Sequence, residues 1–315
     1  MDILEPAQFV SDHRVHRSFF LIGVVLLTYD HLLTLRAEVK YIWASSLRMS
    51  TFWFLLVRYT GLLASFAVVA FYLGDLGHEV CVRMQLVWEV LLVIQELLVE
   101  ITLIVRVFAM YGLNFWILGF LLSIGSVSGA LALWAIIEYG RPVVISPPLG
   151  VPALHGCHVA FTRQTALRLA GAWEGLLVCD TVVFLLTVRR VYIQRPVTLR
   201  VRLPLRMASR QHNAELDRPE TLLERMYKDG ALYFGIIVLA NLANLLTFYL
   251  GDMLLAGSLS WFTTNISVAL LCRLMLSLHQ AGNAGLMSDV SQPSGLETQT
   301  LRFGAPAEDH MRGDG

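Results

Sequence analysis

Residues 113–137 read LNFWILGFLLSIGSVSGALALWAII and contain no Asp, Glu, Lys or Arg. A helix needs about 20 mostly apolar residues to span a bilayer, and in lipid its backbone polar groups must be satisfied within the helix. The stretch therefore predicts a membrane-spanning helix. Small side chains, which let neighbouring helices approach closely, recur along it at Gly119, Ser123, Gly125, Ser126, Ser128, Gly129 and Ala130.

Composition extends this prediction to most of the chain. Of its 315 residues, 56% are hydrophobic and 15% are charged, whereas soluble chains average about 25% charged residues. Six further apolar segments occupy residues 18–35, 51–73, 82–107, 169–188, 230–250 and 253–278. We therefore expect an all-α integral membrane protein, a seven-transmembrane helix bundle over residues 18–280. Residues 1–17 are expected as an outer tail, and residues 281–315, which lack apolar periodicity, as a disordered cytoplasmic tail.

The distribution of Lys and Arg predicts the orientation, because cytoplasmic loops carry an excess of both. With the N-terminus outside, the inner segments hold 17 basic residues and the outer segments hold 6. Ten of the 17 lie in one loop, residues 189–228. We expect an outer N-terminus, a cytoplasmic C-terminus and hence a receptor-like topology. The basic loop is expected to lie against anionic lipid or to contact a cytoplasmic partner.

Two of the four cysteines fall on the outer side of this predicted topology. Cys81 precedes the third apolar segment, and Cys157 lies in the proline-rich loop between the fourth and fifth segments. Because the exterior is oxidising, we expect a disulfide that fastens this loop over the bundle; two unpaired thiols are the alternative. His155 and His158 flank Cys157, but a metal centre would need a further ligand, so none is expected.

The third apolar segment carries three carboxylates on one helical face. From Glu89, Glu96 lies about 20° short of two full turns and Glu100 about 20° beyond three. Ionisable groups within a membrane are costly, so this stripe should face the bundle interior. There it can bind a cationic ligand, relay protons or coordinate an ion. The alternative is hydrogen bonding between helices that only fixes their packing.

Other polar side chains also fall within the predicted spans. Asp30 and Arg58 lie at similar depths, roughly 8–11 Å from the inner ends of their segments. This depth predicts an ion pair, with snorkelling of Arg58 to the headgroups as the alternative. Asp180, Asn241 and Asn244 either line a cavity shared with the three carboxylates or make polar packing contacts.

The N-terminal segment resembles a known family. The run Tyr29-Asp30-x-x-Leu33-Thr34-Leu35-x-x-Glu38-Val39-x-x-Ile42-Trp43 is similar to the signature of a large fungal family, mostly from mushrooms, defined by an N-terminal domain of unknown function. Supporting similarities are Arg58-Tyr59, Arg106 to Gly112, Gly156-Cys157, Asp180 to Thr187, Lys228 to Phe234 and Arg273 to Leu278. The family more often has Glu at the position of Asp180 and Arg at that of Lys228. The resemblance implies a seven-transmembrane fold over about residues 29–278, and no established activity or ligand.

The expected architecture is also similar to that of G-protein-coupled receptors. Arg106 lies 25 residues after Cys81, a spacing similar to that of the receptor arginine at the inner end of helix 3. This makes Arg106 a candidate switch residue. However, Val105 stands where those receptors have an acidic residue, and the seventh segment contains no proline. The similarity is one of architecture, and a shared fold does not settle function.

We expect a receptor-like or sensory membrane protein whose ligand cavity is lined by the three carboxylates of the third segment. The alternative is a transporter or a proton or cation pathway that uses the same groups. Transporters often show internal repeats, and none is evident. No Gly-rich phosphate loop or nucleophile elbow is present, so neither an enzyme activity nor a cofactor is expected. The expected partners are the bilayer and an unidentified ligand, not nucleic acid, and the outer cysteine pair favours the plasma membrane.

Overall fold

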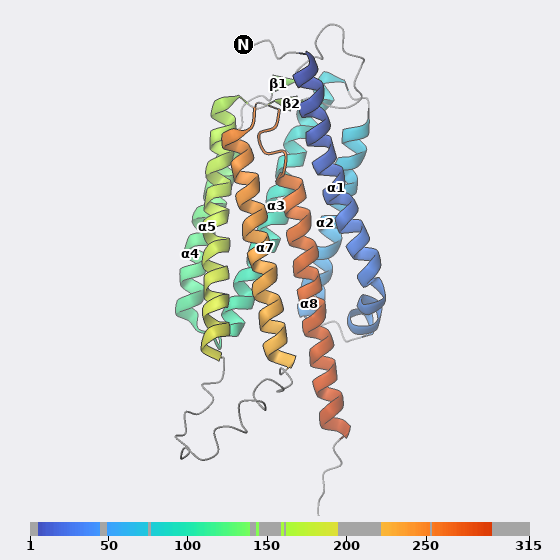
Figure 1. Cartoon of the computed structure of the whole chain (residues 1–315), viewed down its shortest axis with the longest axis vertical. Coiled ribbons are helices and arrows are strands. Elements are labelled where there is room, and N and C mark those ends of the chain that lie inside the picture. Colours follow the sequence, from blue (N-terminus) through green and yellow to red (C-terminus); the bar gives the residue numbers. More distant parts are fainter. Residues whose placement is uncertain are drawn as a thin grey trace, which may run out of the picture.

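The computed structural model describes residues 6–44, 49–74, 77–138, 143–144, 159–160, 162–194, 222–252 and 254–291. Within them, long helices stand side by side in one bundle (Figure 1). They are α1 (Pro6–Glu38), α2 (Met49–Leu73), α3 (His78–Met110), α4 (Phe115–Ile137), α5 (Arg163–Gln194), α7 (Leu222–Leu250) and α8 (Ser260–Ser291). A short π-helix, η1 (Val39–Trp43), follows α1 directly.

One end of the bundle carries a small antiparallel strand pair. β1 (Val143–Val144) pairs with β2 (Val159–Ala160), and β1 contacts α3. We call this the hairpin end; it is the upper end in Figure 1, where α1 also begins. Successive helices alternate in direction, so η1 and the end of α8 lie at the opposite end.

Six of these helices are long and apolar enough to cross a membrane. The six spans are Ala7–Trp43, Met49–Ala70, Phe115–Ile137, Arg163–Val191, Gly230–Leu250 and Ser260–Gly282. The remaining long helix, α3, has 33 residues, but every 18-residue stretch of it carries at least three charged side chains. The chain is therefore a multi-pass helical membrane protein.

The helices differ from the predicted segments at both ends of the chain. α1 begins at Pro6, so residues 6–17, expected as part of a tail, are helical. A proline suits the first turn of a helix, where its missing N–H is not needed. α8 begins at Ser260 rather than at residue 253, and it continues to Ser291, beyond the predicted end of the span. The turn before α8 contains Gly257, whose φ of 72° is one that glycine adopts readily.

The bundle is organised around α3 and α8. α3 contacts α2, α4, α5 and α8, whereas α8 contacts α1, α2, α3 and α7. Toward the hairpin end, Trp88 of α3 and Trp261 of α8 pack edge to face with ring centroids 5.5 Å apart. Phe20 of α1 packs against both rings. Aromatic contacts thus join α1, α3 and α8.

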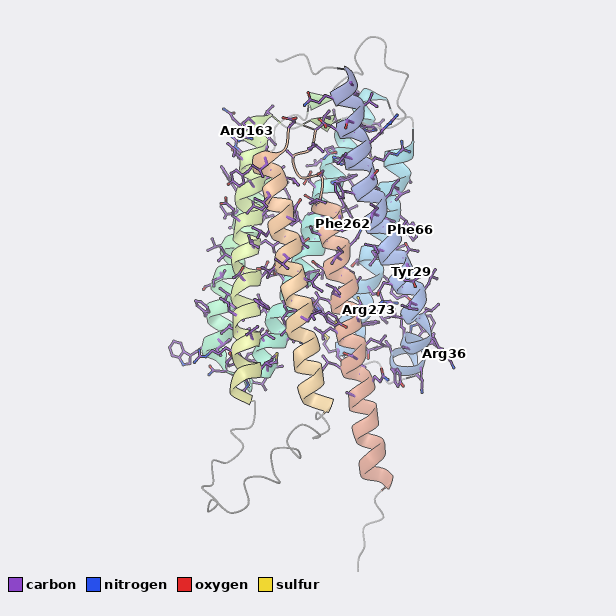
Figure 2. The ribbon with its side chains drawn as sticks, viewed as in Figure 1. Tyr29, Arg36, Phe66, Arg163, Phe262 and Arg273 are labelled. Carbon is purple, nitrogen blue, oxygen red and sulfur yellow. The ribbon has the colours of Figure 1, made fainter. Side chains whose placement is uncertain are left out.

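Large apolar side chains cover the outside of the bundle. Trp116 is 89% exposed, and Tyr29 and Phe66 also lie on the outer surface (Figure 2). Polar side chains such as those of Asn244 and Thr264 are instead fully buried. A soluble protein keeps its charged and polar residues mostly at the surface, so the pattern fits lipid as the surrounding solvent.

Small residues bring α4 close to its neighbours. A Cβ added to Gly175 of α5 would lie 3.1 Å from the Cα of Ser128 in α4. A Cβ added to Gly125 would lie 3.2 Å from Oε1 of Glu100 in α3. Gly119, by contrast, has no neighbour within 4 Å of that position in the described part of the chain. Ser128 and Gly125 therefore permit the close approach expected of this helix, and Gly119 does not contribute to it.

Replacing Gly175 with Val tests the contact between α4 and α5. The added side chain would meet the backbone of Ser128, and overpacking of this kind costs about 1–3 kcal/mol. Gly171 lies one turn earlier in α5, and no atom of the described residues lies within 4 Å of a Cβ added there, so Gly171→Val is the matched control. We expect Gly175→Val to lower the thermal unfolding midpoint in detergent well below that of the control. Equal midpoints would show that the two helices do not approach closely here.

Candidate functional site

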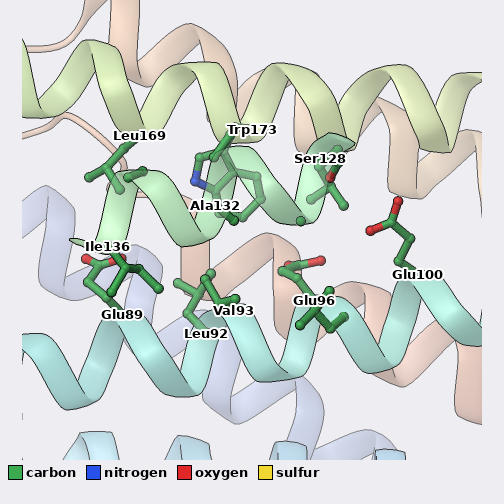
Figure 3. Close-up of a pocket in the computed structure, with 15 residues that line it drawn as sticks. Glu89, Leu92, Val93, Glu96, Glu100, Ser128, Ala132, Ile136, Leu169 and Trp173 are labelled. Atoms are coloured by element: carbon green, nitrogen blue, oxygen red, sulfur yellow. The ribbon is translucent and has the colours of Figure 1, made fainter. Parts of the chain in front are cut away.

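Three glutamates of α3 face one cavity inside the bundle. Glu89, Glu96 and Glu100 project from α3 toward α4 and α5 (Figure 3), and all three are buried. Glu96 and Glu100 are only 7% and 4% exposed. The helical spacing that predicts a stripe thus brings the carboxyl groups to a shared space.

Small and apolar side chains form the rest of the cavity wall. α4 contributes Ser128 and Ala132, and α5 contributes Leu169 and Trp173. The cavity has a volume of about 60 Å³. One water molecule takes up about 30 Å³ in the liquid, and pockets for organic ligands begin near 300 Å³. The cavity therefore fits water, a proton or a small ion, and its volume lies below the range typical of pockets for organic ligands.

The carboxyl groups in this cavity are only partly satisfied by the protein. Gln85 Nε2 donates to Glu89 Oε1 at 3.1 Å, and the Thr264 hydroxyl of α8 donates to Glu96 Oε1. Among the described residues, Glu96 Oε2 and Glu100 Oε1 are buried without a hydrogen-bond partner. Burying such an oxygen without a partner is costly. These two atoms are therefore the places where the cavity can take up a proton, water or a small cation.

The other predicted cavity residues do not line this space. Asn241 Nδ2 of α7 donates to Asp180 Oδ2 of α5 at 2.6 Å, with both side chains buried. Ser260 Oγ of α8 donates to Asn244 Oδ1 at 3.3 Å. These hydrogen bonds link α5 to α7 and α7 to α8, as the packing alternative expects. In the part of the chain that the structure describes, no three His, Cys, Asp or Glu side chains form a group that could hold a metal ion.

The expected ion pair between Asp30 and Arg58 does not form, and each residue has another partner. Arg58 Nε lies 2.9 Å from Glu38 Oε2, an ionic contact without the alignment of a hydrogen bond. Asp30 Oδ1 instead accepts a hydrogen bond from Arg273 Nε of α8. Arg58 also does not snorkel to the headgroups, because its side chain is 3% exposed. Depth along a helix suggested the pairing, but the direction of each side chain around its helix decides it.

Glu38 and Arg58 form the centre of a larger buried cluster, which we call the Glu38 cluster. Trp43 Nε1 and the Tyr59 hydroxyl both donate to Glu38 Oε1 at 3.0 Å. Arg58 Nη2 donates to Thr34 Oγ1 at 2.7 Å and to the backbone carbonyl of residue 31 at 3.0 Å. The cluster joins α1, η1 and α2. Because η1 continues α1 as a helix, Trp43 lies close enough to bind the carboxylate of Glu38, five residues earlier.

Arg106 lies where α3 meets α7. Its guanidinium sits over the Phe234 ring at 5.5 Å from the ring centroid. A Cβ added to Gly230 would lie 2.9 Å from Arg106 Nη2, so the end of the Arg106 side chain packs directly against this glycine. The candidate switch residue therefore contacts α7 near the end of the bundle opposite the hairpin.

Two other predictions fall on residues outside those that the structure describes. The predicted disulfide involves Cys157, which is not described, and the predicted contacts of the basic loop involve residues 189–228, most of which are not described. Cys81 is buried near the start of α3, and Cys179 and Cys272 are free and buried. The disulfide between Cys81 and Cys157 therefore stays a prediction.

Removing one partner of the Glu38 cluster tests its role in stability. Loss of one member of a buried ion pair leaves an uncompensated charge and costs about 3–5 kcal/mol. We expect Glu38→Gln or Arg58→Met to lower the unfolding midpoint strongly, and the double variant Glu38→Gln/Arg58→Met to recover part of the loss. Arg168→Gln, which removes the exposed pair with Glu138, should cost at most about 1 kcal/mol. If all these variants unfold at the same temperature, the cluster does not stabilise the bundle.

A comparison with family models matches residues 18–63 to a family of unknown function (DUF6533). The matched residues cover most of α1, all of η1 and the first part of α2, and so contain Asp30 and the Glu38 cluster. No match was found among the curated proteins. Over its N-terminal segment, the chain is thus similar to a domain of unknown function.

Proposed function

We propose that the chain is a receptor-like sensor of the plasma membrane with seven spans, an outer N-terminus and a cytoplasmic C-terminus. In this arrangement the hairpin end faces outward. The excess of Lys and Arg in the segments at the opposite end supports the orientation. The proposal includes no enzymatic step and no nucleic-acid partner.

α3 supplies the seventh span in this proposal. Its 33 residues extend about 50 Å, which exceeds the hydrocarbon core of about 30 Å. Leu86, Ile94 and Val105 are among its exposed side chains, whereas Glu96 and Glu100 are buried. Ionisable side chains are costly when they face lipid. In α3 the charged residues in mid-membrane face the protein and the apolar residues face lipid, so the helix can span the bilayer.

The sensing event we propose is the uptake of a proton or a small cation between Glu96 and Glu100. The observation that carries it is a pair of buried carboxyl oxygens without a hydrogen-bond partner among the described residues, in a cavity with room for about two water molecules. Cys179 and Asp180 of α5 are the titratable groups beside this pair. Uptake of a proton or cation by Glu96 or Glu100 would reduce the electrostatic repulsion between these carboxylates of α3 and Asp180 of α5.

Hydrogen bonds connect this site to α7 and α8, so a change in its charge can alter the packing of both helices. Glu96 accepts from Thr264 of α8, and Asp180 accepts from Asn241 of α7. At its far end α3 meets α7 through Arg106 and Phe234. Shifts of about 1–2 Å between packed helices are a common form of conformational switching. The expected response is therefore a movement of α7 relative to α3 at the cytoplasmic end.

Spin labels at Val105 and Leu232, both exposed to the surroundings of the bundle, test this response in lipid nanodiscs. We expect acidification to change the distance between the labels by about 1–2 Å or more, because protonation removes the negative charge from the pair. Glu96→Gln and Glu100→Gln should abolish the change. Glu138→Gln, at an exposed carboxylate outside the cavity, should retain it.

The same experiment can refute the proposal. A distance that does not depend on pH or on added Na⁺ or K⁺ would contradict sensing at this site. A pH response that persists unchanged in Glu96→Gln and Glu100→Gln would place the responding group elsewhere.

A proton or cation pathway is the second candidate. It is favoured by the succession of Glu89, Glu96 and Glu100 along α3, which leads from the hairpin end into the bundle. Proteoliposomes loaded with a pH-sensitive dye distinguish the two functions. Flux above that of protein-free liposomes, lost in Glu96→Gln, would favour the pathway. Label movement without such flux would favour the sensor.

We also propose that Cys81 and Cys157 form a disulfide on the outer face. Cys81 is buried near the start of α3, β1 contacts α3, and Cys157 precedes β2 by two residues. Peptide mass spectrometry without reduction should therefore recover a Cys81–Cys157 crosslink from protein isolated from membranes. Free alkylation of both thiols under these conditions would exclude it. The basic loop 189–228 is proposed to contact anionic lipid or a cytoplasmic partner.

A further inference from the structure

A second and much larger cavity lies between α2, α3 and α8, toward the end opposite the hairpin. Its volume is about 710 Å³, within the range of about 300–1,000 Å³ that is typical of pockets for organic ligands. Its lining includes Trp53, Val105, Arg106, Met110, Leu271 and Met275. It shares no lining residue with the cavity that contains Glu96 and Glu100.

The wall of this cavity is mainly apolar, and Ser50, Thr102 and Arg106 are its polar or charged residues besides the indole N–H of Trp53. The indole N–H of Trp53 donates to the Thr102 hydroxyl at 2.8 Å, and that hydroxyl donates to the backbone carbonyl of Leu98 at 2.6 Å. These polar atoms are therefore already engaged within the wall. Arg106 is the one charged residue among the described lining residues. Methionines, whose flexible side chains adapt to irregular partners, contribute to the wall at three positions.

The cavity opens to the surroundings of the bundle. Several of its lining residues are exposed, including Met49 at 76% and Val105 at 54%. Arg106 lies four residues from the end of α3, about 6 Å along the helix axis. In a membrane this places the guanidinium near the level of the headgroups, while Ile101 lies more than one turn deeper. A bilayer component can therefore enter with its charged end at Arg106 and its apolar end inside.

We propose that this cavity binds a single-chain anionic amphiphile, a long-chain fatty acid, with its carboxylate on Arg106 and its chain between α2, α3 and α8. The planar guanidinium suits a carboxylate, because the two groups can form parallel charge-assisted hydrogen bonds. The face of the Phe234 ring holds the guanidinium in place. The mainly apolar wall surrounds the acyl chain of the fatty acid, so the acyl chain contacts mostly apolar side chains.

Photocrosslinking tests the site in nanodiscs of uncharged phospholipid. The probes are a diazirine-bearing fatty acid and its methyl ester, and labelled peptides are identified by mass spectrometry. We expect the acid to label α3 and α8 around Val105 and Met275. Val105→Trp, which fills the cavity, should reduce this labelling about tenfold or more, whereas Val127→Trp, at an exposed position of α4, should not. Ala109→Phe is a second cavity-filling variant, and unfolding midpoints establish that each variant is folded.

Replacing Arg106 separates recognition of the carboxylate from simple hydrophobic filling. Arg106→Gln should reduce labelling by the acid about tenfold, since a hydrogen bond to a charged group is worth at least this factor. It should leave labelling by the methyl ester unchanged. Arg168→Gln, at the hairpin end, is the matched control.

Three results would overturn the proposal. One is equal labelling of the wild type by acid and ester together with no effect of Arg106→Gln. Another is undiminished labelling in folded Val105→Trp and Ala109→Phe. The third is displacement of the acid by phosphatidylglycerol as efficiently as by unlabelled fatty acid, which would identify a two-chain lipid as the occupant.

Discussion

Lipid cannot solvate charge, and the arrangement of this bundle depends on how its buried carboxylates are compensated. On the α1 side, Asp30 meets Arg273, and Glu38 meets Arg58, Trp43 and Tyr59. Between α3, α4 and α5, Glu96 and Glu100 each retain a buried oxygen without a partner among the described residues. The first set is compensated by arginines and donors of the protein. The second set lacks such compensation among the described residues, and it is the set to which we assign the proposed function.

The family match covers the compensated set of carboxylates. The matched residues 18–63 contain Asp30 and the Glu38 cluster, whose groups tie α1 and η1 to α2 and α8. Charges that neutralise each other within the protein stabilise the fold. The cavity of α3, α4 and α5 lies outside the matched segment, whereas Met49, Ser50 and Trp53 of that segment line the larger cavity beside Arg106.

The helical character of the chain and the inward stripe of α3 follow from local rules. Apolar length predicts a span, and a spacing of seven and four residues places Glu89, Glu96 and Glu100 on one face whatever surrounds the helix. The partners of Asp30 and Arg58 depend instead on distant elements. Depth gave the wrong pair, because it says nothing of the rotation of each helix or of an arginine contributed by α8. Likewise, the polar first turns of α1 gave no apolar signal, and the 60 Å³ volume depends on side chains of three helices.

We propose that Glu96 and Glu100 exchange a proton or a small cation while the bundle is in the membrane. Infrared difference spectroscopy of the protein in lipid films observes the carboxyl groups themselves, independently of any helix movement. On a step from alkaline to acidic buffer, we expect a new C=O stretching band of a protonated, buried carboxyl group that is lost in Glu96→Gln/Glu100→Gln and retained in Glu138→Gln. A band that is the same in all three proteins, or no change in the carboxyl region at all, would contradict it.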